Sequence, residues 1–158
     1  MDNSTLKIFV LDDDMMYGKM LASYVESLGH TAETFQLADD CLVNLNHNPD
    51  LVLLDHNLGG DQKGVDVLRF IKHERPDISV IYITAEENVA LVSDVFRSGS
   101  DDFIGKDSAS LLRLKLKIEE LFARKVVRLN RRNKSKKMLV VGALLLTVYI
   151  IAHYILMN

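Results

Sequence analysis

The sequence predicts an α/β fold in which helices cover both faces of a doubly wound, mostly parallel sheet of five strands. Short apolar runs alternate with stretches of helical periodicity, turn residues separate them, and polar or charged residues follow several of the runs. The central run is 51–55, LVLLD, in which four apolar residues precede an aspartate. Such a run without polar alternation is typical of a strand buried on both faces of the sheet.

The other elements follow along the chain. Strands are predicted over residues 6–11, 31–35, 78–83 and 102–105. Helices are predicted over residues 15–28, 37–46, 65–74 and 86–97, with glycine or proline near their ends. From Leu111 to Leu121 the leucines fit both a strand and a helix pattern. Good helix formers and a capping serine at Ser108 or Ser110 favour a helix there.

Composition divides the chain into two regions. Its 158 residues, 48% of them apolar, suit one ordinary domain with an addition. The single cysteine, Cys41, excludes a disulfide framework and a clustered-cysteine metal site. Residues 1–123 carry a net charge of -11, whereas residues 124–137 carry +8. This asymmetry implies different physical surroundings for the two regions.

Polar residues follow four of the predicted strands, and in a parallel sheet these strand ends meet at one edge. They are Asp12, Asp13, Asp55, Thr84 and Lys106. Three crowded carboxylates raise one another's pKa unless a cation neutralises them, and oxygen ligands suit Mg²⁺ better than zinc. With the metal and Lys106 nearby, Asp55 is predicted to attack a phosphoryl group, to which Thr84 donates a hydrogen bond.

In order and spacing these residues resemble the receiver domain of two-component response regulators, over residues 5–123. The resemblance implies a flavodoxin-like sheet with strand order 2-1-3-4-5. It also implies that Asp55 is the phosphoacceptor and that a histidine kinase or histidine phosphotransfer protein is the donor.

Further roles are implied by the same resemblance. Asp12, Asp13 and Asp55 would hold Mg²⁺ together with the backbone carbonyl of Asn57, two residues beyond the acceptor. Phe103 lies three residues before the lysine, in the place of the family's switch aromatic. It would act together with Thr84 to change the surface formed by the fourth helix, fifth strand and fifth helix.

The chain departs from the family pattern at several positions. Gly59 replaces the usual proline of the loop, Gly64 comes one residue late, and Asp107 follows the lysine where proline is usual. We therefore expect a more flexible loop after the acceptor. His56, next to the acceptor, is predicted to be a solvent-facing loop residue.

An apolar run over residues 138–157 follows the basic segment 124–137. As a helix it would be about 30 Å long, the thickness of a bilayer's hydrocarbon core, which predicts a transmembrane helix. The alternative is a buried core or oligomer helix. The flanking basic residues favour the cytoplasmic side and contact with anionic lipid, whereas nucleic acid is not expected as their partner.

The predicted protein is therefore a stand-alone receiver held in the cytoplasmic membrane by a single-pass C-terminal tail, with the receiver facing the cytoplasm. It is expected to be no enzyme and to signal through contacts with an unknown downstream protein. One alternative is a hydrolase resembling haloacid-dehalogenase-type phosphatases, which need a second aspartate where this chain has Asn57. The other is a degenerate receiver that serves as a scaffold.

Overall fold

The computed structural model describes residues 5–59, 63–86 and 88–157, with side chains in the last helix described for residues 110–131, 134 and 137–139. Five parallel strands form one sheet in the order β2-β1-β3-β4-β5. They are β1 (Lys7–Leu11), β2 (Thr31–Phe35), β3 (Leu51–Asp55), β4 (Ser79–Thr84) and β5 (Asp102–Gly105). The flavodoxin-like α/β sheet predicted from the sequence is confirmed.

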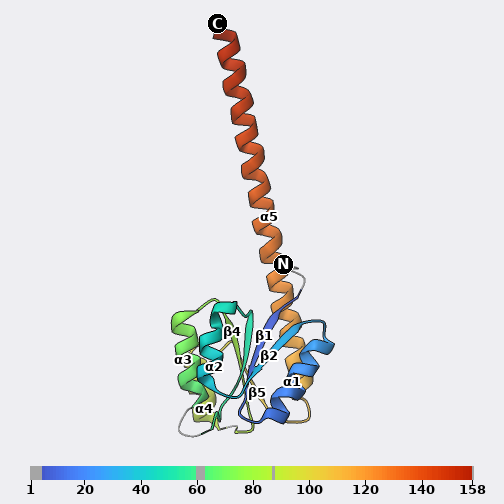
Figure 1. Ribbon diagram of the computed structural model, residues 1–158, viewed down its shortest axis with the longest axis vertical. Coiled ribbons are helices and arrows are strands. Elements are labelled where there is room, and N and C mark those ends of the chain that lie inside the picture. Colours follow the sequence, from blue (N-terminus) through green and yellow to red (C-terminus); the bar gives the residue numbers. More distant parts are fainter. Residues whose placement is uncertain (1–4, 60–62, 87, 158) are drawn as a thin grey trace. The chain divides into compact units, whose positions relative to one another are not determined.

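Helices cover both faces of this sheet (Figure 1). They are α1 (Met15–Ser27), α2 (Ala38–Val43), α3 (Gly64–Glu74), α4 (Val89–Arg97) and α5 (Ser110–Met157), with a 3-10 turn η1 (Asn44–His47) after α2. α1 and the first turns of α5 lie on one face, and α2, α3 and α4 lie on the other. The ambiguous leucine-rich run after Ser110 is helical, as expected.

The core explains why the strand ends hold fixed positions. All five residues of β3 are buried, as expected for the central strand of a covered sheet. Val52 and Leu54 pack in one cluster with Leu68 and Ile71 of α3. Burying each such side chain contributes about 1.5–3 kcal/mol, so the centre of the sheet is a rigid base for the residues that follow it.

The predicted membrane anchor is wrong. Within the part of the chain that the structure describes, no helix is long and apolar enough to cross a membrane. The apolar run 138–157 belongs to α5, whose described part carries charged side chains such as Arg113, Glu120 and Lys134. The predictions of a single-pass tail and of a membrane localisation are therefore corrected. The prediction of lipid contact loses its basis, because it depended on that tail.

Most side chains of residues 138–157 lie outside the described residues, so the alternative of a buried helix there has no structural account. By its internal contacts the chain divides into two compact units, residues 1–118 and 119–158. The sheet and the strand-end residues belong to the first unit.

Gly64 begins α3 at a place where the backbone approaches the end of β3. A Cβ at this position would lie 2.1 Å from the Asp55 carbonyl oxygen and 2.8 Å from the Tyr82 hydroxyl. The Gly64 amide donates a hydrogen bond to the His56 carbonyl at 2.8 Å. Only a residue without a side chain permits this contact, which explains why position 64 carries glycine.

Gly64→Ala is predicted to lower the free energy of unfolding by about 2–3 kcal/mol, because the backbone of β3 must move to admit the methyl group. Urea unfolding of the full chain measures this change. Gly18→Ala is the matched control, since its Cβ would meet nothing closer than the Asp12 Cβ at 3.8 Å. Inside α1 that change should stabilise the fold by about 0.5–1 kcal/mol. Equal effects of the two substitutions would contradict the close approach at Gly64.

Candidate functional site

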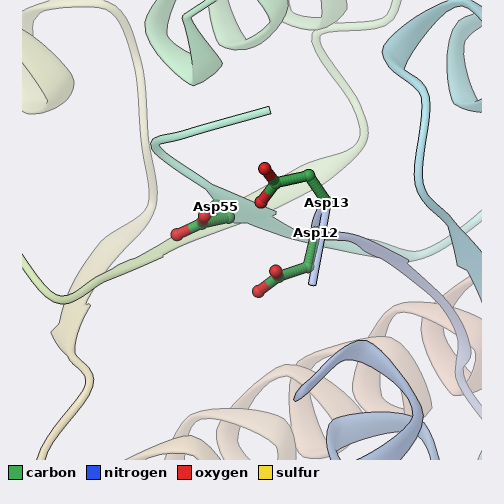
Figure 2. Close-up of side chains that lie close together, drawn as sticks. All are labelled: Asp12, Asp13 and Asp55. Atoms are coloured by element: carbon green, nitrogen blue, oxygen red, sulfur yellow. The ribbon is translucent and has the colours of Figure 1, made fainter. Parts of the chain in front are cut away.

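Three aspartates gather at the carboxyl edge of the sheet (Figure 2). Asp12 and Asp13 directly follow β1, and Asp55 ends β3. One carboxylate oxygen from each lies within 4.8 Å of the others, an arrangement that could hold a metal ion. Asp12 and Asp55 are buried and Asp13 is exposed, so the cluster opens to solvent on the side of Asp13.

Lys106 lies against this cluster from the loop after β5. Its Nζ is 2.8 Å from Asp12 Oδ2 and 3.1 Å from Asp55 Oδ1. Its backbone amide donates to the Thr84 carbonyl at 2.8 Å, which continues the pairing of β4 with β5. The structure thus brings together the ends of β1, β3 and β5. Lys106 and Asp12, which are in contact, lie 94 residues apart in the sequence.

The electrostatics of the cluster are dominated by negative charge. Burial raises the pKa of Asp12, the Lys106 ammonium acts to lower it, and the charge of Asp55 adds to the increase. For Lys106, burial disfavours the ammonium, but its bonds to Asp12 and the nearby carboxylates outweigh burial and raise its pKa. The pKa of Asp12 is thus raised mainly by burial, and the pKa of Lys106 is raised by its two carboxylate neighbours. Three carboxylates face one ammonium here. The site therefore favours any additional cation.

Thr84 ends β4 and is almost completely buried. Its Oγ1 accepts a hydrogen bond from the Glu86 amide at 3.1 Å. The Glu86 carboxylate in turn accepts one from the Asn88 side chain at 2.6 Å, and Asn88 Oδ1 caps α4 by accepting from the Leu91 amide at 2.8 Å. A chain of hydrogen bonds thereby connects Thr84 to the start of α4.

His56 is buried, which corrects its prediction as a solvent-facing residue. Its Nδ1 shares a 2.7 Å hydrogen bond with the Tyr82 hydroxyl of β4, and its Nε2 is 3.7 Å from Glu86 Oε2. Burial raises the pKa of Tyr82, so its hydroxyl remains protonated at neutral pH. The hydrogen bond to Tyr82 satisfies the imidazole and draws it inward.

Asn57 lies on the exposed turn after His56 and pairs with Lys63 in an isolated antiparallel bridge. Together with the His56–Gly64 hydrogen bond, this bridge joins the two ends of the loop after Asp55. Residues 60–62, in the middle of that loop, lie outside the described residues. The backbone at Asn57 is therefore fixed on both sides, next to Asp55.

Phe103 of β5 is half-buried and stacks on Tyr82, with ring centroids 6.2 Å apart and planes inclined by 14°. It lines a groove of about 580 Å³ between α4, β5 and the start of α5. The groove is lined by Asn88, Val89, Val92, Ser93, Phe103, Gly105, Asp107 and Arg113. This is the surface that the sequence analysis associated with Phe103.

Two tyrosines that the sequence did not assign to the site contact its residues. Tyr82 hydrogen-bonds His56, and the ring of Tyr17 lies under the Lys106 ammonium. In the sequence both occupy apolar positions, Tyr17 on α1 and Tyr82 in β4. The available signal was a hydroxyl-bearing side chain in the otherwise aliphatic run 80–83.

Residues 8–118 match the response regulator receiver domain family, over a region that includes all of the strand-end residues. The chain belongs to this family. Receiver domains are phosphorylated by histidine kinases or phosphotransfer proteins, and they bind Mg²⁺ through a cluster of acidic residues. Membership favours the receiver interpretation over the hydrolase alternative.

This receiver is similar to larger regulators and to isolated domains. It is 34% identical over 98 residues to the luminescence regulatory protein LuxO of Vibrio campbellii, covering 61% of this chain and 21% of LuxO. It thus spans about a fifth of the length of that relative. The NtrX receiver domain of Brucella abortus is 31% identical, with a TM-score of 0.67 and coverage of 73% and 98% of the two chains.

A third similarity shows the fold alone. The receiver domain of a LuxO repressor protein from Vibrio parahaemolyticus superimposes with a TM-score of 0.70 at 24% identity, covering 78% of this chain and 95% of that one.

Proposed function

We propose that this receiver accepts a phosphoryl group on Asp55 from the phosphohistidine of a histidine kinase or histidine phosphotransfer protein. One observation carries the proposal: the Lys106 ammonium contacts both Asp55 and Asp12 at the edge where the strands end. A cation held against the nucleophile offsets the negative charge that resists the approach of a phosphoryl group. The proposed domain comprises residues 5–123.

Mg²⁺ is the proposed cofactor, held by Asp12, Asp13, Asp55 and the backbone carbonyl of Asn57. The donor set fits this ion, because three carboxylates offer oxygens within 4.8 Å of one another and the site has excess negative charge. The exposed side of the cluster, at Asp13, leaves room for the waters that Mg²⁺ retains. When bound, the ion would neutralise charge on the oxygens of the transferring group.

The protein's own residues then have distinct tasks. A carboxylate oxygen of Asp55 forms the new O–P bond while the P–N bond of the phosphohistidine breaks, and the leaving imidazole retains the electron pair. The Lys106 ammonium, already beside Asp55, pairs with a phosphoryl oxygen. The Thr84 hydroxyl donates its proton in a hydrogen bond to another phosphoryl oxygen, and because its Oγ1 also accepts from the Glu86 amide, a reorientation of the Thr84 side chain is passed on to Glu86.

The output would start from this change at Thr84. Moving the hydroxyl disturbs the hydrogen-bond chain through Glu86 and Asn88 that caps α4. It also changes the space available to Phe103, which lines the groove at the same end of α4. We propose the groove face as the surface that contacts a downstream protein in response.

Incubation of the full chain with Mg²⁺ and phosphoramidate is predicted to add one phosphoryl group, detected by intact mass. Asp55→Asn should abolish the addition, because its amide is no nucleophile toward phosphorus. Asp39→Asn, an exposed aspartate of α2, is the control and should be phosphorylated like the native chain.

Other outcomes have defined meanings. Continuous turnover of phosphate esters would support the hydrolase alternative. A native chain that gains no phosphoryl group with Mg²⁺ present would support the scaffold alternative and sink the proposal.

The double variant Asp12→Asn, Asp13→Asn is predicted to weaken Mg²⁺ binding by at least about tenfold, since Asp55 alone chelates this ion poorly. Calorimetric titration measures the affinity. Glu74→Gln with Asp77→Asn removes the same charge near the end of α3 and before β4, away from the carboxyl edge. That control should bind Mg²⁺ like the native chain. Equal affinity in the first variant and the native chain would place the metal elsewhere.

Thr84→Ala is predicted to leave Asp55 phosphorylatable but to blunt the response at the groove, because no hydroxyl remains to follow the phosphoryl group. Amide spectra with and without phosphodonor report on Leu91, Phe103 and their neighbours. Thr84→Ser retains the hydroxyl and should respond like the native chain. A full response in the alanine variant would discard this mechanism.

A further inference from the structure

The Lys106 ammonium has a third neighbour besides the two aspartates. Its Nζ lies 4.2 Å from the centroid of the Tyr17 ring. A cation within about 6 Å of a ring centroid is attracted by the ring's negative face, more strongly where water is excluded. The Lys106 side chain is only 18% exposed, so much of its surroundings consists of carboxylate and aromatic groups.

A single turn of chain places both Asp12 and Tyr17 around the ammonium. The Asp14 amide donates to Asp12 Oδ1 at 3.0 Å, which leaves Asp12 Oδ2 for Lys106. The Asp14 carboxylate accepts hydrogen bonds from the amides of Met16 and Tyr17 at 2.9 and 3.2 Å and so begins α1. The aromatic ring is therefore held on the same rigid turn as the carboxylate.

Asp12 and Tyr17 would respond differently to a bound metal ion. Asp12 is a proposed ligand of Mg²⁺, and a carboxylate that gives its charge to a dication attracts the ammonium less strongly. The ring of Tyr17 has no such competing partner. Lysine has a flexible four-carbon stem, so a contact that metal binding leaves intact adds to the pairing with Asp55 in holding the ammonium there.

We propose that Tyr17 is a positioning residue for Lys106, whose ring keeps the ammonium beside Asp55 while Asp12 serves the metal. This inference rests on the proposed function of Asp55 as phosphoacceptor. The ring face carries the effect. The buried Tyr17 hydroxyl forms no hydrogen bond of normal geometry with a described residue, although Ser110 lies beside it.

The contact is tested first by rate. Full-length variants are incubated with saturating Mg²⁺ and phosphoramidate, and intact mass is followed over time. Tyr17→Leu, which keeps apolar volume but removes the ring, should slow phosphorylation about three- to tenfold. Tyr17→Phe, which keeps the ring, should stay within about twofold of the native rate. A leucine variant that is as fast as the native chain overturns the inference.

A double-variant series shows whether the effect passes through the lysine. In the Lys106→Met background, Tyr17→Leu should cause no further loss of rate, because no ammonium remains to be positioned. A further loss of similar size would mean that Tyr17 acts elsewhere and would overturn the inference. Tyr17→Met replaces the leucine variant if that protein does not fold by its amide spectrum.

A spectroscopic measurement needs no phosphodonor. The ε-methylene protons of Lys106 should be shifted upfield by the ring in the native chain and in Tyr17→Phe, and not in Tyr17→Leu. On Mg²⁺ addition the upfield shift should persist, and its loss in the native chain overturns the inference. If the shift persists but no phosphoryl group is gained, the proposed function fails and the contact itself stands.

Discussion

The site depends on a balance of charge that the sheet imposes. Parallel strands bring Asp12 and Asp55 to one edge, and both side chains are buried there. Two buried carboxylates at one edge repel each other, and Lys106 supplies one ammonium for these two aspartates and exposed Asp13. The remaining negative charge favours an additional cation at this edge of the sheet.

The sequence was sufficient for features that depend on short-range pattern. The apolar run 51–55 predicts a covered strand, and five such runs between helical stretches predict the sheet. Strand-end residues could be gathered because parallel strands share an edge. By contrast, the burial of His56 depends on Tyr82, 26 residues later, and no local pattern encodes that hydrogen bond. A histidine on a loop is usually exposed, and here a single tertiary contact reverses that tendency.

The mistaken membrane span shows a second limit of prediction from sequence, which concerns segments taken in isolation. An apolar run of suitable length was interpreted by itself, whereas in the structure it belongs to α5, which begins at Ser110. The described part of that helix carries many charged side chains, among them Arg113 and Lys134. Length and apolarity of residues 138–157 were the basis of that prediction, and within the described part of the chain no helix meets both requirements for crossing a membrane.

Two series of contacts lead from the carboxyl edge of the sheet toward the groove. Thr84, Glu86 and Asn88 form a chain of hydrogen bonds that ends on the cap of α4. His56, next to Asp55, is hydrogen-bonded to Tyr82, whose ring stacks on Phe103. In the first series the Thr84 hydroxyl can turn to donate its proton to a new acceptor. The second series is buried and packed, and it loses contacts if it moves. The contacts of His56, Tyr82 and Phe103 thus stay in place, while a change at Thr84 moves the start of α4 relative to them.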